Sequence, residues 1–206
     1  MPYDSADWIA LLFDGPSAIS VPINSSFRNI NDLLNAARAA PGTIRLSHSG
    51  VGGTWHAVNL TLEANTGVRF AQIPYNGGIE SATAAAGGHV DAATSGATEA
   101  FPMVQSGHLR FLGISGEQPD PMFPGVPTFA EQGIDGMWGT FGAVAAPRGI
   151  PLAARATIES AIIKVTSTDE WKDFVVNTLQ GTVNFKVGEE LHAFLADLDR
   201  IFEQMF

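Results

Sequence analysis

Cysteine is absent from the 206-residue sequence. Disulfide bonds, thiol catalysis and cysteine-ligated metal centres are therefore excluded, whereas neither an oxidising nor a reducing compartment is. The histidines show none of the spacings that are typical of metal ligands, such as two histidines on one helical face beside a carboxylate. They are His48, His56, His89, His108 and His192. We therefore expect no metal and no cofactor.

Basic residues are scarce, because 11 Lys and Arg stand against 21 Asp and Glu, which gives a formal charge of −10. Such a surface repels the phosphates of nucleic acids and anionic lipids, so neither is an expected partner. The same overall charge repels an anionic ligand, which would have to be held by local hydrogen-bond donors.

Long hydrophobic runs are missing as well. No apolar segment approaches the roughly 18 residues that would suggest a membrane span. Residues 1–7 carry neither the basic region nor the apolar region of a signal peptide. If Met1 is the native start, the sequence predicts a cytoplasmic chain.

Strand-like and helix-like segments alternate in a chain of ordinary globular composition, with 45% hydrophobic and 16% charged residues. Apolar runs predict strands at 18–23, 43–47, 68–73, 89–93, 109–115 and 138–145. Helical spacing predicts a helix over 30–37, capped by Ser25 and Ser26, a helix through Leu60 and Leu62 that ends at Gly67, and helices at 80–86, 98–105 and 129–132. This order predicts right-handed βαβ crossovers and an α/β fold with a doubly wound, mainly parallel sheet.

The pattern changes near residues 141–147, where a domain boundary is expected. The remainder is mainly helical, with predicted helices at 152–166, 169–178 and 189–206 and a brief strand at 182–185.

A glycine-rich segment, residues 47–56, follows one predicted strand and opens the next helix. Glycines let backbone N–H groups turn inward, and a helix N-terminus adds a partial positive charge, so the segment is suited to binding a carboxylate or phosphate. Ser49 and Thr54 could add hydroxyl donors. The alternative is a tight turn in which the glycines only relieve crowding.

Two further loops are predicted at the same edge of the sheet. Residues 74–78 again expose glycine N–H groups, and Tyr75 can wall a pocket. The alternative, which this loop alone would favour, is a turn in which Tyr75 is half-buried packing. Residues 95–98 form the third predicted loop, after strand 89–93. Because parallel strands end at one edge, where doubly wound folds bind ligands, the three loops are expected to lie together.

The sequence lacks the motifs of several other kinds of site. No Gly-Lys-Ser/Thr ends the first loop, no dinucleotide fingerprint is present, and no Gly-x-Ser-x-Gly elbow supports an esterase. His56 is expected to be packed or hydrogen-bonded, and Asp91 to be structural. Asp197, Asp199 and Glu203 lie on the solvated face of a predicted amphipathic helix.

Five motifs in this order resemble those of the tripartite tricarboxylate transporter substrate-binding receptors, often called Bug-type proteins. They are Pro-Gly-Thr-Ile-Arg-Leu-Ser-His-Ser-Gly-Val-Gly-Gly at 41–53 with His56 after it, Ile-Pro-Tyr-Asn-Gly-Gly at 73–78, Gly-Gly-His-Val-Asp at 87–91, Gly-Val-Pro-Thr-Phe-Ala-Glu-Gln-Gly at 125–133 and Ala-Ala-Pro-Arg-Gly-Ile-Pro at 145–151. The resemblance runs from about residue 2 to the C-terminus.

The resemblance implies a type II periplasmic-binding-protein fold of two domains. Domain II would be complete over 18–140, and 1–17 with 141–206 would be a remnant of domain I. Such a protein is a periplasmic receptor rather than an enzyme, and it delivers a small organic carboxylate to the membrane permease subunits of its transporter. Carried over by position, the ligand-binding residues would be Ser47, His48, Ser49, Gly50, Gly52, Gly53, Thr54, His56, Tyr75, Asn76, Gly77, Gly78, Ser95, Gly96 and Ala97.

The sequence departs from the family in two ways. His48 and Gly53 stand where small hydroxyl residues are common, so a different specificity is expected. Family members also begin with a signal peptide and a Pro-Phe-x-x-Gly-Gly-type loop that grips the other end of the ligand, and this sequence starts after that region.

A truncated domain I would leave apolar residues such as Ile158, Ile162 and Val165 partly uncovered, which predicts self-association. A clean monomer in light scattering at high concentration would contradict that hypothesis.

Three alternatives remain open from the sequence. The chain could be a remnant of such a receptor that no longer binds ligand. It could be the effector domain of a regulator that shares the type II fold, although no helix-turn-helix precedes it. It could also be a hydrolase that uses His56 with Ser47 or Ser49, although no triad is specified.

Overall fold

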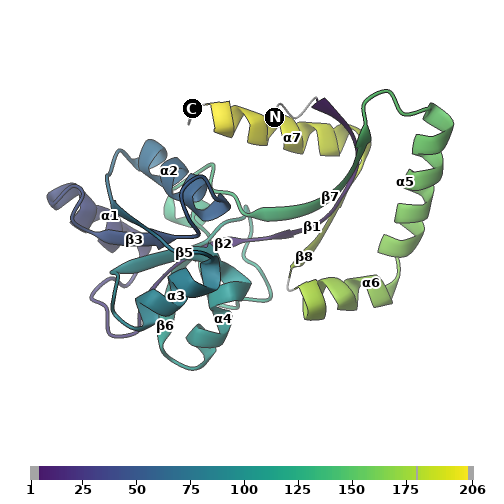
Figure 1. Cartoon of the computed structure of the whole chain (residues 1–206). Helices are drawn as coiled ribbons and strands as arrows, with labels where there is room; N and C mark the ends of the chain where they lie inside the picture. The colour runs from purple at the N-terminus through teal and green to yellow at the C-terminus, as the bar shows by residue number, and fades with distance from the viewer. Residues whose placement is uncertain (1–4, 180, 204–206) are drawn as a thin grey trace. The chain divides into compact units, whose positions relative to one another are not determined.

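The chain folds into two units in the computed structural model, which describes the backbone of residues 5–179 and 181–203 (Figure 1). The larger unit is Pro16–Thr140, and the smaller unit combines the residues up to Gly15 with those from Phe141 onward. Each unit has its own sheet.

The larger unit contains a five-stranded sheet in the order β4-β3-β5-β2-β6. Its strands are β2 (Ser17–Pro22), β3 (Arg45–His48), β4 (Ala71–Pro74), β5 (Ala92–Gly96) and β6 (Leu109–Ile114). Strand β3 pairs in parallel with β4 and β5, whereas β2 is antiparallel to both β5 and β6. The predicted α/β class with a mainly parallel sheet is confirmed, with β2 as the one reversed strand of this sheet.

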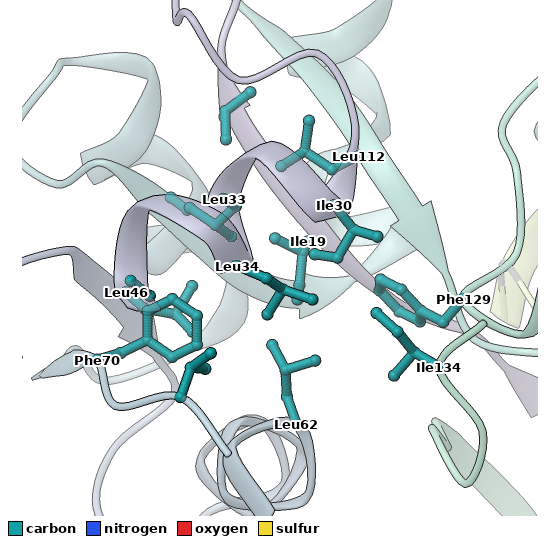
Figure 2. Packing of buried hydrophobic residues seen from close by; sticks show 14 residues of the cluster. Ile19, Ile30, Leu33, Leu34, Leu46, Leu62, Phe70, Leu112, Phe129 and Ile134 are labelled. Carbon is teal, nitrogen blue, oxygen red and sulfur yellow. The ribbon is translucent and has the colours of Figure 1, made fainter. Parts of the chain in front are cut away.

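Helices cover both faces of this sheet. They are α1 (Ile30–Ala39), α2 (Thr54–Thr66), α3 (Gly78–Ala86) and α4 (Ala97–Gln105), with a short 3-10 helix at Ala130–Gln132. Neighbouring residues of β2 enter different hydrophobic clusters, because Ile19 packs with the apolar side chains of α1 and α2 and Ala18 packs with those of α3 and α4. Since successive strand residues point to opposite faces, α1 and α2 lie on one face and α3 and α4 on the other. Figure 2 shows the first cluster, in which Ile30, Leu34 and Phe129 meet.

Helix α1 begins later than the predicted serine cap. Asn29 is the N-cap residue, and its side chain accepts a hydrogen bond from the N–H of Asp32. The Asp32 carboxylate accepts in turn from the N–H of Arg28 at 2.7 Å. These two hydrogen bonds fix the helix start at Asn29, so the prediction of Ser25 and Ser26 as caps was wrong.

Strand β5 also begins later than predicted, at Ala92 rather than at residue 89. Asp91 lies just before the strand and binds the Arg45 guanidinium through both oxygens, at 2.7 and 3.1 Å, while also accepting the Arg45 N–H at 2.8 Å. These hydrogen bonds from Arg45 lower the pKa of Asp91. The expected structural role of Asp91 is confirmed, because its side chain ties the residue before β5 to the first residue of β3.

The smaller unit contains a three-stranded sheet in the order β7-β1-β8. Its elements are β1 (Ala6–Gly15), β7 (Thr140–Pro147), α5 (Leu152–Thr166), α6 (Asp169–Phe174), a π-helical turn at Val175–Leu179, β8 (Thr182–Lys186) and α7 (Gly188–Glu203). Strand β1 was not predicted, and residues 204–206 of the last predicted helix lie outside the described residues. Leu11, Leu191 and Leu195 form the core of this unit. Among the described helices, none has the length and apolar character that crossing a membrane would require.

Candidate functional site

The candidate site is the edge of the larger sheet where β3, β4 and β5 end, which we call the carboxyl edge. The loops after β3 and β4 adjoin there, because the N–H of Tyr75 donates to the carbonyl of His48 at 2.9 Å. A Cβ added at Gly50 would lie 3.3 Å from the Tyr75 carbonyl oxygen. The end of β5 adjoins α2, since a Cβ at Gly96 would lie 3.3 Å from the Trp55 ring. The loops after β3 and β4 therefore lie together at one edge, as predicted, and the end of β5 lies beside them.

Three helices begin at this edge on glycine. Gly53, Gly77 and Gly96 are the N-caps of α2, α3 and α4, and in the described structure no side chain of a capping residue accepts a hydrogen bond there. Helix α1 differs, because Asn29 caps it. The first N–H groups of an α-helix have no partner within the helix, so three glycine-capped N-termini place backbone N–H groups and partial positive charge at one edge.

Positive backbone angles shape the loop that leads into α2. Gly50 has φ 93° and Gly52 has φ 78°, a region that side-chain-bearing residues rarely adopt. The N–H of Gly52 donates to Nδ1 of His56 at 3.1 Å, and the N–H of Gly53 donates to the carbonyl of Gly50. The loop therefore folds back on the first turn of α2 and depends on its glycines.

Two histidine rings stack beside this loop. The ring centroids of His48 and His56 lie 4.5 Å apart with an interplanar angle of 29°. Nδ1 of His48 lies 3.1 Å from the Gly50 carbonyl oxygen, so it carries the proton and donates. Burial lowers the pKa of His48, the neighbouring His56 lowers it further, and the Gly50 carbonyl opposes both. The lowered pKa favours the neutral ring of His48, and its buried Nε2 has no hydrogen-bond partner among the described residues.

The arrangement does not assemble the hydrolase considered above. Ser47 Oγ lies 2.7 Å from Ser81 Oγ inside the unit, and the hydrogen bond of His56 within the described chain is the one to Gly52. A nucleophile and its base must be within hydrogen-bond reach of each other. The described residues also contain no group of three or more histidines and carboxylates placed to hold a metal ion.

The predicted site residues fall into two sets. Those on the surface of the carboxyl edge are partly or fully exposed, namely Ser49, Gly50, Gly52, Gly53, Thr54, His56, Tyr75, Asn76 and Gly77. Those that are buried are Ser47, His48, Gly78, Ser95, Gly96 and Ala97. The Ser95 hydroxyl donates to the Gly96 carbonyl at 3.0 Å, so it is engaged within the unit.

The third predicted loop does not exist. Ser95 and Gly96 are the last residues of β5, and Ala97 and Thr98 already belong to α4. The N–H of Ala97 donates to the Pro16 carbonyl at 2.9 Å, which ties the junction to the residue before β2. The strand therefore passes directly into the helix, and the prediction of a loop at 95–98 was wrong.

Sequence reasoning missed Glu99, whose carboxylate lies at this edge. Oε2 of Glu99 accepts the N–H of Gly96 at 2.6 Å. A Cβ added at Gly78 would overlap the same carboxylate, so the Glu99 side chain of α4 packs directly against the first turn of α3. The spacing of Gly96 and Glu99, an N-cap followed three residues later by glutamate, is a capping signal that could have found it.

Comparisons with known proteins point to one family. Residues 1–197 match the family model of the tripartite tricarboxylate transporter family receptor. The chain is 30% identical over 190 residues to the "UPF0065 protein in tcbD-tcbE intergenic region" of Pseudomonas sp. (strain P51), covering 88% of this chain and 56% of that protein. It thus spans little more than half the length of this relative.

Solved structures agree with that match. A TctC solute binding protein from Polaromonas superposes with a TM-score of 0.88 and 28% identity, covering 99% of this chain and 69% of the other. An R. palustris protein determined with adipate superposes with a TM-score of 0.75 and 20% identity, covering 98% and 69%. The predicted type II periplasmic-binding-protein fold is confirmed.

Proposed function

We propose that this chain, which belongs to the tripartite tricarboxylate transporter receptor family, binds a small organic carboxylate at its carboxyl edge. The observation that carries the proposal is the convergence of three glycine-capped helix N-termini, those of α2, α3 and α4, on that edge. Backbone N–H groups at helix N-termini are general acceptor sites for carboxylates and phosphates.

Neutral hydrogen-bond donors suit the binding of an anion by this acidic protein. Its net charge of −10 gives an anion no overall attraction. Arg45, which is at the start of β3 rather than at its end, is already paired with Asp91. Hydrogen bonds to a charged acceptor are stronger than neutral ones, so a few well-placed N–H groups can hold a carboxylate without a basic side chain.

The first turn of α2 is the best-placed donor set. The N–H groups of Thr54, Trp55 and His56 precede the first intrahelical hydrogen bond, which runs from Ala57 to Gly53. The half-buried Ser49 and the exposed Thr54 carry hydroxyls on the same loop and helix start. Tyr75 would wall the site from the neighbouring loop. Ser47 and Ser95 would support the site from within, since their hydroxyls are engaged inside the unit.

The wider biological role follows from family membership. We infer that the larger unit corresponds to domain II of a periplasmic receptor and the smaller unit to part of its domain I. We propose further that the receptor lies in the periplasm and delivers its ligand to membrane permease subunits. The self-association expected from the sequence stays a prediction. The chain spans 69% of the Polaromonas structure, so the remaining third would supply the rest of domain I.

A thermal-shift screen tests the proposed function. The 206-residue chain would be screened against mono-, di- and tricarboxylates, with the matching primary amides as uncharged controls. A ligand at about 100 times its dissociation constant adds about 2.7 kcal/mol of stability. For a chain of this size, that corresponds to a rise in melting temperature on the order of 5 to 11 °C.

The two outcomes separate the leading hypothesis from its alternative. A shift with an acid but not with its amide would support carboxylate binding and would identify the acid. A flat panel on a chain that melts cooperatively would contradict the proposal and would favour a folded receptor remnant without useful affinity.

A further inference from the structure

The carboxyl edge is electrostatically uneven. The first turn of α2 contains no acidic residue, whereas those of α3 and α4 contain Glu80 and Glu99. Glu80 is exposed and its carboxylate accepts the N–H of Asn76 at 3.0 Å, so it binds the backbone of the loop that precedes α3. Glu99 instead lies where the starts of two helices meet, between Gly78 and Gly96.

The position of Glu99 is that of an anion held by helix N-termini. Its Oε2 takes the N–H of Gly96 at 2.6 Å, and both glycines leave room for the carboxylate that a methyl group would remove. The partial positive charges of α3 and α4 are thus already balanced by a side chain of the protein. A ligand carboxylate at this end of the edge would meet a fixed negative charge rather than an open donor set.

One oxygen of Glu99 is still available. Within the described chain, the Glu99 carboxylate accepts the Gly96 N–H through Oε2, and Oε1 is not among the buried polar atoms that lack a partner. An ionised carboxylate accepts hydrogen bonds through both oxygens and donates none. Oε1 is therefore suited to a hydroxyl or ammonium group of a ligand and repels a second carboxylate.

We propose that Glu99 determines the ligand class of the carboxyl edge, by accepting a hydrogen bond from a hydroxyl or ammonium group and excluding a second carboxylate. The inference rests on the proposed function, in which the ligand carboxylate binds at the first turn of α2. The ligand would then be a monocarboxylate whose other end is a hydrogen-bond donor. A purely structural Glu99 would cap α4 equally well and would have no effect on ligand preference.

Isothermal titration calorimetry on the whole chain can decide between these roles. The ligands are length-matched acids that differ only at the far end: succinate, 4-hydroxybutanoate and 4-aminobutanoate, and the six-carbon series of adipate, 6-hydroxyhexanoate and 6-aminohexanoate. Glu99→Gln keeps an oxygen for the Gly96 N–H while removing the charge. We expect the unsubstituted chain to prefer a donor-ended acid over its dicarboxylate by about tenfold or more, and Glu99→Gln to reduce that preference by about tenfold.

Asp32→Asn is the matched control. Asp32 is also a first-turn acid that accepts a backbone N–H, at 2.7 Å from Arg28, and its removal changes the net charge by the same amount. Helix α1 follows β2, which is antiparallel to its neighbours, so this helix starts at the opposite edge of the sheet. The control should leave the preference unchanged.

Each outcome bears on one of the two proposals. A preference that is equal in the unsubstituted chain and Glu99→Gln, with binding retained, overturns the role of Glu99 but keeps carboxylate binding. Dicarboxylate binding that is gained only in Glu99→Gln supports the role directly. Failure of both folded proteins to bind any of the acids overturns the proposed function, and the inference with it.

Discussion

Replacing Ile30 with alanine should lower the free energy of unfolding by about 2–5 kcal/mol. Ile30 is the first residue of α1 and has 0% of its surface exposed. It packs in the cluster that joins α1 to the sheet, beside Leu34 and Phe129 (Figure 2). Truncation would remove buried methyl groups and leave a cavity that the surrounding elements can fill only partly. Equilibrium urea unfolding followed by circular dichroism would measure the loss.

Ile79→Ala provides the control for this variant. Ile79 is the second residue of α3 in the same unit, and 58% of its surface is exposed. The chemical change and the helical position are similar, so the expected change is about 0.5 kcal/mol or less. Equal losses in the two variants would show that the packing around Ile30 is not what stabilises the unit.

Helices could be predicted well where apolar residues repeat at helical spacing and where glycine or proline marks a helix end. Helix α5 spans Leu152–Thr166, as predicted from the proline before it. Helix α2 ends at Gly67, whose φ of 68° closes the helix in the left-handed region. In both cases the signal is local, because it depends on residues within one or two turns of the helix end.

Strands were harder to predict because their limits depend on distant partners. Strand β1 pairs with β8, which lies some 170 residues later, and its apolar run shows little alternation. The residue before β5, Asp91, is paired with Arg45, a residue from another strand. The reversed direction of β2 also follows from its pairing with β5 and β6 rather than from its own sequence.

The candidate site was predictable only to the level of its backbone. Glycines at the ends of β3 and β4 indicate exposed N–H groups, and the topology places them together. The orientation of side chains was not encoded locally, since Ser47 points inward to Ser81 and the Glu99 carboxylate reaches Gly78 across a helix boundary. The first contact depends on how α3 packs on β3, and the second on how α3 packs on α4.

Replacing Gly53 with alanine should remove ligand binding as well as destabilise the protein. A Cβ at Gly53 would lie 2.8 Å from the Ser49 carbonyl oxygen and 3.2 Å from that of Gly50. Both neighbours are backbone, so the loop must open, and overpacking of this kind costs about 1–3 kcal/mol. The opening would break the hydrogen bond from Gly53 to Gly50 and displace the first N–H groups of α2. We expect the thermal shift induced by the best acid of the panel to disappear.

Gly77→Ala isolates the cause, because Gly77 is also a glycine N-cap at the carboxyl edge. Its φ is −164°, which is extended backbone open to any residue, and nothing lies within 4 Å of its added Cβ. Both variants place alanine at an N-cap, so the loss of capping preference is common to the two. Gly77→Ala should therefore stay within about 1 kcal/mol of the unsubstituted protein and keep its ligand-induced shift. If Gly53→Ala keeps the shift as well, the loop before α2 does not hold the ligand, and the donors of α3 and α4 would have to.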